Sequence, residues 1–257
     1  MIPVFVISLK DSYNRRKHIE KHLKELGLNF EWFDAINGSK LAPAEIKDLV
    51  DEAKLKKDPF FLSPGAIGCQ LSHYYLYKEI IKRNLQYALI LEDDIIMEKN
   101  FVPCIDKLAA SLNTNEIIAI YYQSKKPLKI ISSTKKQIDK NYSTYTPLDY
   151  VQPISTGAYM ISRGACESLV KIILPVHWTA DSWRDYHNEG GFESLRCIYP
   201  RPVDATDATS TLQYKNQDWK FNLKKFIDRY KIFPVYHILL QRRKKLRQKM
   251  MVIEMVP

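Results

Sequence analysis

Three consecutive carboxylates, Glu92, Asp93 and Asp94, directly follow an apolar run of strand length, Tyr87-Ala-Leu-Ile-Leu91. The run predicts a strand that is buried on both faces. Three negative charges are not buried without partners, so we expect them at a sheet edge, facing solvent or a cation. Ligands of α/β sheets bind at the carboxyl ends of strands, and oxygen ligands suit Mg²⁺ or Mn²⁺. The pattern fits a metal–diphosphate site, and equally an acidic cap between strand and loop.

A second segment that could do chemistry is His177-Trp-Thr-Ala-Asp-Ser-Trp-Arg-Asp-Tyr186. Thr179 can cap a short helix whose first turn holds Asp181 and whose exposed aromatic residues are expected to be Trp178 and Trp183. Aromatic rings beside carboxylates are typical of sugar-binding sites, because the C–H-rich face of a sugar packs on a ring and its hydroxyls need acceptors. A core tryptophan with capping acids explains the same pattern.

Basic residues open the first predicted helix, over residues 12–26, where Arg15, Arg16 and Lys17 lie in the first turn. The helix dipole disfavours cations there, so they gain if a phosphate or another anion is near. Solvated surface charge is the alternative. Asp34 ends a short strand over 29–33 and could accept hydrogen bonds from a ribose or a base, or cap a turn.

Strands and helices alternate along the chain, which predicts an α/β fold with a parallel sheet. His73 lies in the middle of a long helix that starts at Ser63-Pro-Gly65, and a mid-helix histidine is usually a packing residue. We expect strands at 3–9, 29–33, 87–91, 116–122, 155–162 and 195–199, and helices at 12–26, 41–58, from 63, 101–112 and 164–174. The polar stretch 123–147 is predicted to be a flexible loop or a hairpin over the site.

Length and composition describe a globular chain of 257 residues without low complexity. No apolar run approaches the roughly 18 residues of a membrane span, and the first residues lack the features of a signal peptide. The four cysteines are far apart, with no C-x-x-C pair. They indicate reduced thiols in a cytoplasmic protein rather than disulfides or a zinc site.

The net charge of +10 is concentrated at the carboxyl end. Residues 220–257 hold 11 Lys or Arg and two acids, whereas the rest of the chain is close to neutral. Aromatic and aliphatic residues alternate with this charge, so we predict a basic amphipathic helical tail over 216–257, after a catalytic domain over 1–215. Its expected partner is an anionic membrane surface, with Arg242-Arg-Lys-Lys-Leu-Arg247 adding roughly 1 kcal/mol per cation. No nucleic-acid motif is present, so we expect no nucleic-acid partner.

The order of several motifs resembles the family 25 glycosyltransferases, which include lipooligosaccharide galactosyltransferases and collagen-modifying relatives. The resemblance covers roughly residues 3–205 and ends with Asp181 after a Pro-ended helix. The other matching motifs are Val6-Ile-Ser-Leu9 with Asn14-Arg-Arg16, Phe33-Asp-Ala-Ile-Asn-Gly38, Gly65-Ala-Ile-Gly-Cys-Gln-Leu-Ser-His73, Leu91-Glu-Asp-Asp-Ile95 and Ser155-Thr-Gly-Ala-Tyr-Met-Ile-Ser162.

This resemblance implies a GT-A type nucleotide-sugar-binding fold, with a mostly parallel central sheet and helices on both faces. It implies transfer of a hexose, most often galactose from UDP-galactose, with inversion at the anomeric carbon. The expected acceptor is a lipid-linked oligosaccharide of the lipooligosaccharide or lipopolysaccharide core. The basic tail would then hold the enzyme at the cytoplasmic face of the inner membrane.

The resemblance also implies roles for single residues. Asp94 matches the last acid of the metal motif and is the expected ligand of Mn²⁺ or Mg²⁺, while Glu92 and Asp93 position the metal, its waters or the ribose. The chain departs from its relatives at Val203-Asp-Ala-Thr-Asp207, where they often carry a glutamine, so Asp204 is a provisional further ligand. The donor pocket is expected to include Ser8, Leu9, Arg15, Asp34, Ser72 and His73, with Thr156 and Gly157 as its floor.

Inverting transfer needs a base opposite the departing UDP. The resemblance places Asp181 in that role, with Asp185 as the second choice. Two other functions remain open at this point. One is a metal-dependent phosphohydrolase acting on nucleotide sugars, although three adjacent acids suit one ion better than the two-metal sites of such enzymes. The other is a non-enzymatic basic membrane adaptor.

Overall fold

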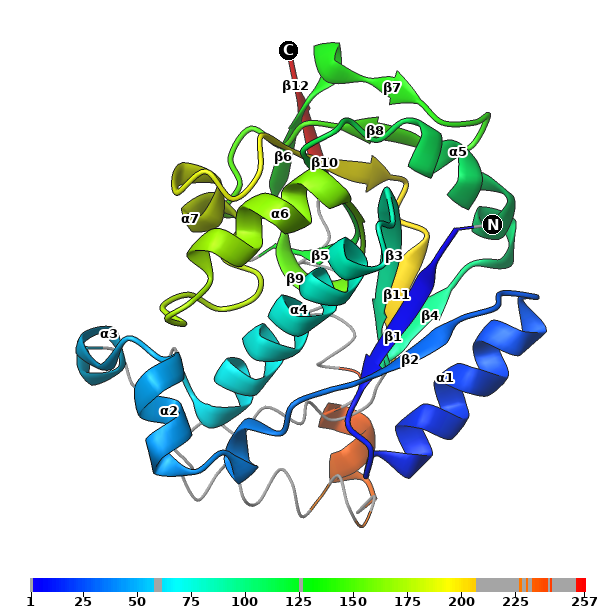
Figure 1. The fold of residues 1–257 in the computed structure, drawn as a ribbon. Coiled ribbons are helices and arrows are strands. Elements are labelled where there is room, and N and C mark those ends of the chain that lie inside the picture. The colour runs from blue at the N-terminus through cyan, green and yellow to red at the C-terminus, as the bar shows by residue number, and fades with distance from the viewer. Residues whose placement is uncertain are drawn as a thin grey trace.

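An eight-stranded sheet crosses the molecule in this computed structural model, and helices cover both of its faces (Figure 1). The structure describes residues 2–57, 62–124, 127–206, 227, 230, 233–239, 241 and 253–257. In spatial order the strands are β2 (Glu31–Asp34), β1 (Val4–Ser8), β3 (Tyr87–Glu92), β9 (Ile154–Ser162), β5 (Glu116–Gln123), β10 (Ser194–Tyr199), β8 (Ser143–Tyr145) and β7 (Lys136–Gln137).

The strands of this sheet run mostly in one direction. β1 is parallel to β2 and β3, and β5 is parallel to β10. Only β9 and β8 oppose their neighbours in this sheet. The predicted α/β architecture, with a mostly parallel central sheet between helices, is therefore confirmed.

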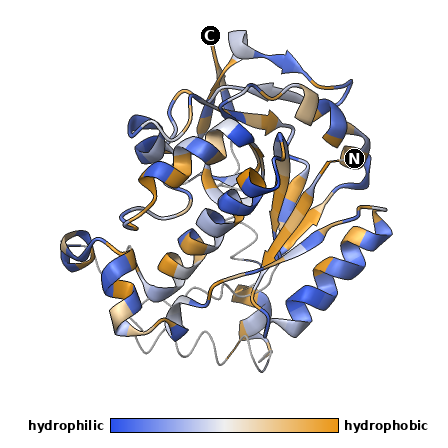
Figure 2. Ribbon diagram, viewed as in Figure 1, coloured by the Kyte–Doolittle hydropathy of each residue, from blue (hydrophilic) through white to orange (hydrophobic). Residues whose placement is uncertain are grey.

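Each face of the sheet has its own core because neighbouring residues on a strand point to opposite faces. Val4 and Val6 of β1 pack with buried residues of α1 (Tyr13–Glu25), whereas Phe5 and Ile7 pack with α4 (Pro64–Lys82). Apolar residues dominate the central strands, and polar residues dominate the outer side of α1 (Figure 2). The short apolar runs in the sequence are explained by burial on both faces.

Further helices complete the two layers. α6 (Arg163–Ile172) and α7 (Trp183–Asn188) share the core of α4, while η2 (Lys99–Cys104) and α5 (Ile105–Ala110) share that of α1. η1 (Gly38–Lys40), α2 (Pro43–Leu49) and α3 (Glu52–Lys57) lie near the start of α4. The Ser63 hydroxyl accepts a hydrogen bond from the Ala66 backbone N–H, which confirms the predicted start of α4.

The polar stretch 123–147, predicted to be a loop or hairpin over the site, forms a hairpin in a different place. It contains β6 (Leu128–Ile131), η3 (Ser132–Thr134) and the antiparallel pair β7–β8. β8 pairs with β10 and extends the sheet at the end far from β1 and β3. A hairpin is present, but its predicted place over the acids is wrong, because its buried residues Ser143, Thr144 and Tyr145 continue the sheet.

Most of the predicted helical tail over 216–257, and its boundary at 215, lie outside the described residues. Of the described part, residues 227, 230, 235–239 and 241 are helical. β12 (Ile253–Val256) is a strand that pairs in parallel with β6, so this end of the tail is not helical. Across the described ranges, no helix has both the length and the apolar composition that a membrane span requires.

Candidate functional site

A cleft of about 880 Å³ opens where the carboxyl ends of β1 and β3 meet the first turns of α1 and α4 and the segment 179–185. This is the edge at which α/β sheets bind ligands. The cleft brings together ten of the residues predicted from the sequence: Ser8, Leu9, Arg15, Ser72, His73, Glu92, Asp93, Asp94, Thr156 and Asp181.

Three predicted residues do not line this cleft as the structure describes it. The half-exposed Asp34 at the end of β2 pairs with Arg16 at 2.6 Å and with Lys10 at 3.2 Å. Gly157 lies against Tyr121, whose ring would be 2.6 Å from an added Cβ, so its position is explained by packing. Asp204 belongs to β11 (Val203–Ala205), which pairs with β4 (Ile95–Met97), and its exposed carboxylate accepts from Arg201.

Arg15 is the cation that faces the acidic motif. Its guanidinium pairs with the buried Asp93 and lies 2.9 Å from a carboxylate oxygen of Asp94. The hydroxyl of Ser8, at the end of β1, donates to the other oxygen of Asp93. The anion near the basic first turn of α1 is therefore a carboxylate of the protein itself. Arg15 links the first turn of α1 to the carboxyl end of β3.

The neighbouring acids have different electrostatic surroundings. Burial, and then the negative charge of Glu92, raise the pKa of Asp94 to about 6, although Arg15 opposes the rise. Burial would also raise the pKa of Glu92, but His73, a hydrogen bond from Thr156 and the charge of Arg15 outweigh it and lower that pKa. Asp94 is thus the carboxylate whose charge is least compensated, and a bound cation would stabilise it.

The acids do not all point to one place. Glu92 accepts a hydrogen bond of 2.6 Å from Thr156 and faces His73, whereas Asp93 and Asp94 face Arg15. Mg²⁺-like ions usually bind through one or two carboxylates together with substrate phosphates. Asp94 lines the open cleft and fits such an ion, whereas Asp204 is not among the described residues that line it.

Ser72 holds a loop that lines the cleft. Its hydroxyl accepts from the Ile36 backbone N–H at 2.8 Å and donates to the Gly68 carbonyl at 2.6 Å. A Cβ on Gly68 would lie 2.5 Å from backbone atoms of Gly38 and Ile36. The glycines let the loop and α4 approach closely, so Ser72 positions the wall of the cleft.

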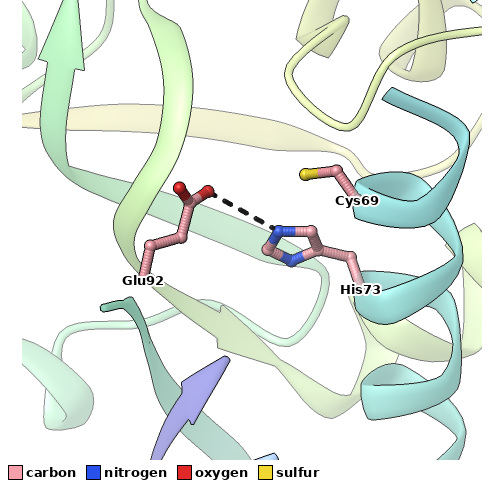
Figure 3. Close-up of side chains that lie close together, drawn as sticks. All are labelled: Cys69, His73 and Glu92. Atoms are coloured by element: carbon pink, nitrogen blue, oxygen red, sulfur yellow. Dashed lines mark ion pairs between the residues drawn. The ribbon is translucent and has the colours of Figure 1, made fainter. Parts of the chain in front are cut away.

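His73 and Cys69 lie one turn apart on α4 and face Glu92 (Figure 3). His73 is 1% exposed, and its Nδ1 is 2.7 Å from the Tyr159 hydroxyl, which in turn contacts Tyr77. Burial, followed by the charges of Glu92 and Asp181, raises the pKa of the Cys69 thiol well above its ordinary value. Sequence reasoning missed Cys69, although its i, i+4 spacing to His73 was a usable signal.

Asp181, in the segment between α6 and α7, also lines the cleft and is fixed there by hydrogen bonds. One carboxylate oxygen accepts from the Ser155 backbone N–H at 3.1 Å, and the other accepts from the Thr179 hydroxyl at 2.9 Å. Ser155 adopts a left-handed φ of 104°, a strained conformation typical of functional sites. Trp183 is not exposed as expected: it is buried in the core beside α4, although it also borders the cleft.

The family model for "Glycosyltransferase family 25 (LPS biosynthesis protein)" matches residues 1–183. The chain belongs to glycosyltransferase family 25. The resemblance drawn from the ordered motifs is therefore confirmed.

Curated members of the family align with parts of this chain. Procollagen galactosyltransferase 1-B of Xenopus laevis is 26% identical over 213 residues, 78% of this chain and 35% of that protein. Lipooligosaccharide biosynthesis protein lic2B of Haemophilus influenzae is 34% identical over 96 residues, 37% of this chain and 35% of that protein. The chain thus spans about a third of the length of these relatives.

A solved structure also resembles the chain: a glycosyltransferase involved in the glycosylation of the major capsid of PBCV-1. Its TM-score is 0.34 at 12% sequence identity, and the match covers 67% of this chain and 64% of that one. A likeness at this level carries no argument about function.

Proposed function

We propose that this family 25 member transfers a hexose, galactose from UDP-galactose, with inversion to a lipooligosaccharide or lipopolysaccharide core acceptor. The names of the galactosyltransferase and lipooligosaccharide relatives support this assignment. The observation that carries it is the cleft itself, which is lined both by the acids that end β3 and by Asp181, a carboxylate that comes from a different segment and has its own hydrogen bonds. Activation of the donor requires acids that hold a cation, and deprotonation of the acceptor requires a separate carboxylate that acts as a base.

Asp94 is proposed to hold Mn²⁺ or Mg²⁺, with Asp93 beside it, and such an ion would stabilise the negative charge that develops on a departing UDP diphosphate. Arg15 supplies a fixed positive charge next to both acids. Asp93 is buried and held by both Ser8 and Arg15. Asp94 also contacts Arg15 but is more exposed, so Asp94 is the acid more available to a ligand in the cleft.

Asp181 is proposed to act as the general base. As the acceptor hydroxyl attacks the anomeric carbon, the carboxylate takes the hydroxyl proton and the bond to UDP breaks. The hydrogen bonds from Ser155 and Thr179 hold this carboxylate in one orientation. Asp185 also lines the cleft and is the second choice.

The same proposal includes the acceptor and the cellular location of the enzyme. A lipid-linked oligosaccharide is built at a membrane surface, and the 11 Lys or Arg of residues 220–257 would attract anionic lipid. We therefore place the enzyme in the cytoplasm, peripherally on the inner face of the inner membrane.

A screen of UDP-sugars with Mn²⁺ tests the function. UDP-galactose with Mn²⁺ should raise the melting temperature, and UDP release should depend on a core oligosaccharide acceptor. Release of phosphate from UDP-sugars without any acceptor would instead favour a phosphohydrolase. Failure of UDP and Mn²⁺ to stabilise the protein would favour a membrane adaptor.

A further inference from the structure

Cys69, His73 and Glu92 form a cluster of unlike ligand groups that the proposed transfer reaction does not explain. The Cys69 sulfur, a His73 ring nitrogen and a Glu92 carboxylate oxygen lie within 4.8 Å of one another (Figure 3). Cys69 and His73 come from the same face of α4, and Glu92 comes from the end of β3. Two rigid elements therefore hold the three groups.

One ring nitrogen of His73 faces the Glu92 carboxylate without forming a hydrogen bond to it. Nε2 of His73 is buried and has no hydrogen-bond partner among the described residues, and its distance to the Glu92 carboxylate is 3.9 Å. The other ring nitrogen, Nδ1, is engaged by Tyr159. If Nδ1–H donates to Tyr159, the Nε2 lone pair faces a carboxylate, and a cation between them would satisfy both.

We propose that Cys69, His73 and Glu92 form a binding site for a thiophilic divalent metal of the zinc class. Thiolate and imidazole ligands select zinc over Mg²⁺ or Mn²⁺, which prefer oxygen. Zinc binds these ligands at about 2.0–2.3 Å, so ligand atoms around one ion lie roughly 3–4 Å apart. Bringing ligand atoms that lie within 4.8 Å of one another to that spacing requires shifts of roughly an ångström.

The site supplies three protein ligands and leaves a fourth position toward the cleft, since all three residues line it. Binding releases the thiol proton of Cys69 to solvent, because the thiolate is the ligand. The Tyr77–Tyr159–His73 hydroxyl chain orients the imidazole as outer partners of metal-bound histidines do. A bound zinc ion would hold the Glu92 carboxylate and so draw it away from the sugar nucleotide. If the proposed function holds, zinc therefore inhibits transfer.

The site is tested by metal binding without any sugar nucleotide, so the result does not depend on the transferase proposal. Reduced, chelator-treated protein is titrated with Zn²⁺ against a chromophoric chelator, and with Co²⁺ as a spectroscopic probe. We expect one equivalent to bind, with a thiolate-to-cobalt charge-transfer band. Cys69→Ser should weaken zinc binding at least about tenfold and remove the band.

Two control variants separate this site from its surroundings. Cys104→Ser, at a buried cysteine on the other face of the sheet, should leave zinc binding unchanged. Cys197→Ser, at the buried cysteine of β10, should also leave zinc binding unchanged. Absence of the charge-transfer band in the unaltered protein would overturn the proposal, and so would equal zinc affinity in Cys69→Ser.

Discussion

At the scale of single residues, the negative charge of the acidic motif is only partly compensated by one arginine and a few polar neighbours. Arg15 pairs with Asp93 and Asp94, while Glu92 is compensated by His73 and Thr156. Asp94 keeps a raised pKa of about 6 because burial and Glu92 outweigh Arg15. Removing Arg15 should therefore make the stability of the folded protein depend more strongly on a bound metal ion.

Arg15→Met should lower the stability of the metal-free protein by about 2 kcal/mol, less than a fully buried pair because the Arg15 side chain is 19% exposed. Mn²⁺ should then raise the melting temperature more than it does in the unaltered protein, because the ion replaces a lost positive charge. Thermal unfolding with and without Mn²⁺ measures both effects. Lys17→Met, at an exposed site on the same helix, is the control and should change neither.

Asp181→Asn should reduce turnover by at least about a hundredfold, because an amide cannot take the acceptor proton. Binding of UDP with Mn²⁺ should change little, since Asp181 is proposed to act on the acceptor. Steady-state kinetics and UDP titrations separate these effects, and Asp185→Asn is the matched comparison. Full turnover in Asp181→Asn together with loss in Asp185→Asn would transfer the role of base to Asp185.

Residue types and positions predicted much of the site but not the directions of its side chains. Glu92, Asp93 and Asp94 were found because charges must leave a buried strand at its end, and the structure places them in the cleft. Asp34 also ends a strand, yet Arg16 and Lys10 hold it outside the described lining. Cys69 was missed because its i, i+4 spacing to His73 indicates a site only once Glu92, on another element, is known to face both residues.

At the scale of elements, a buried ion pair joins the first residue of β5 to β10. Glu116, 1% exposed, accepts hydrogen bonds from Arg196 at 2.6 and 2.9 Å and also from Asn113 and Ser194. Burial would raise the pKa of Glu116, but Arg196 and Asn113 outweigh it and lower that pKa. This carboxylate therefore stabilises the sheet only while it is ionised.

Glu116 should make stability depend on pH in the acid range. Its pKa is lower in the folded state, so its contribution is present above the unfolded value of about 4.3 and is lost as pH falls through the folded value. Glu116→Gln should lower the free energy of unfolding by about 3 kcal/mol at neutral pH, because Arg196 stays buried without its charge partner. The difference from the unaltered protein should shrink below about pH 4.

Urea denaturation at several pH values measures this contribution. The control is Glu31→Gln, which breaks the exposed pair with Arg83 and should cost less than about 1 kcal/mol. Equal losses in the two variants, or a Glu116→Gln difference that does not vary with pH, would contradict the assignment.

Local sequence signals predicted the elements better than their pairing. Ser63 and Gly27 mark helix ends through capping and a positive φ, so the start of α4 and the end of α1 could be read directly. The stretch containing β7 and β8 carried only weak alternation, and nothing local showed that β8 would pair with β10 rather than cover the site. Partners distant in sequence are chosen by packing, which one sequence does not display.

At the scale of the whole molecule, the basic segment 220–257 ends in a strand, β12, that belongs to the folded body. β12 pairs with β6, so deleting the tail would also remove a strand. Replacing the cations of 242–247 by glutamine is a cleaner change and should weaken binding to anionic vesicles, by roughly 1 kcal/mol per cation near the surface. Vesicle sedimentation at two salt concentrations measures the loss, and neutral vesicles serve as the control.

Unchanged sedimentation with anionic vesicles after this substitution would contradict a membrane role for the basic run. The catalytic proposal would stand in that case, because the cleft is built by residues 7–185.

The central claim is that the acids at the end of β3 bind a hard divalent ion that stabilises the leaving diphosphate. A crystal structure of this protein with Mn²⁺ and UDP tests it most directly. The account predicts Mn²⁺ coordinated by the Asp94 carboxylate and by the diphosphate, with UDP lying between the first turns of α1 and α4. Mn²⁺ and UDP bound away from Asp94 would contradict it.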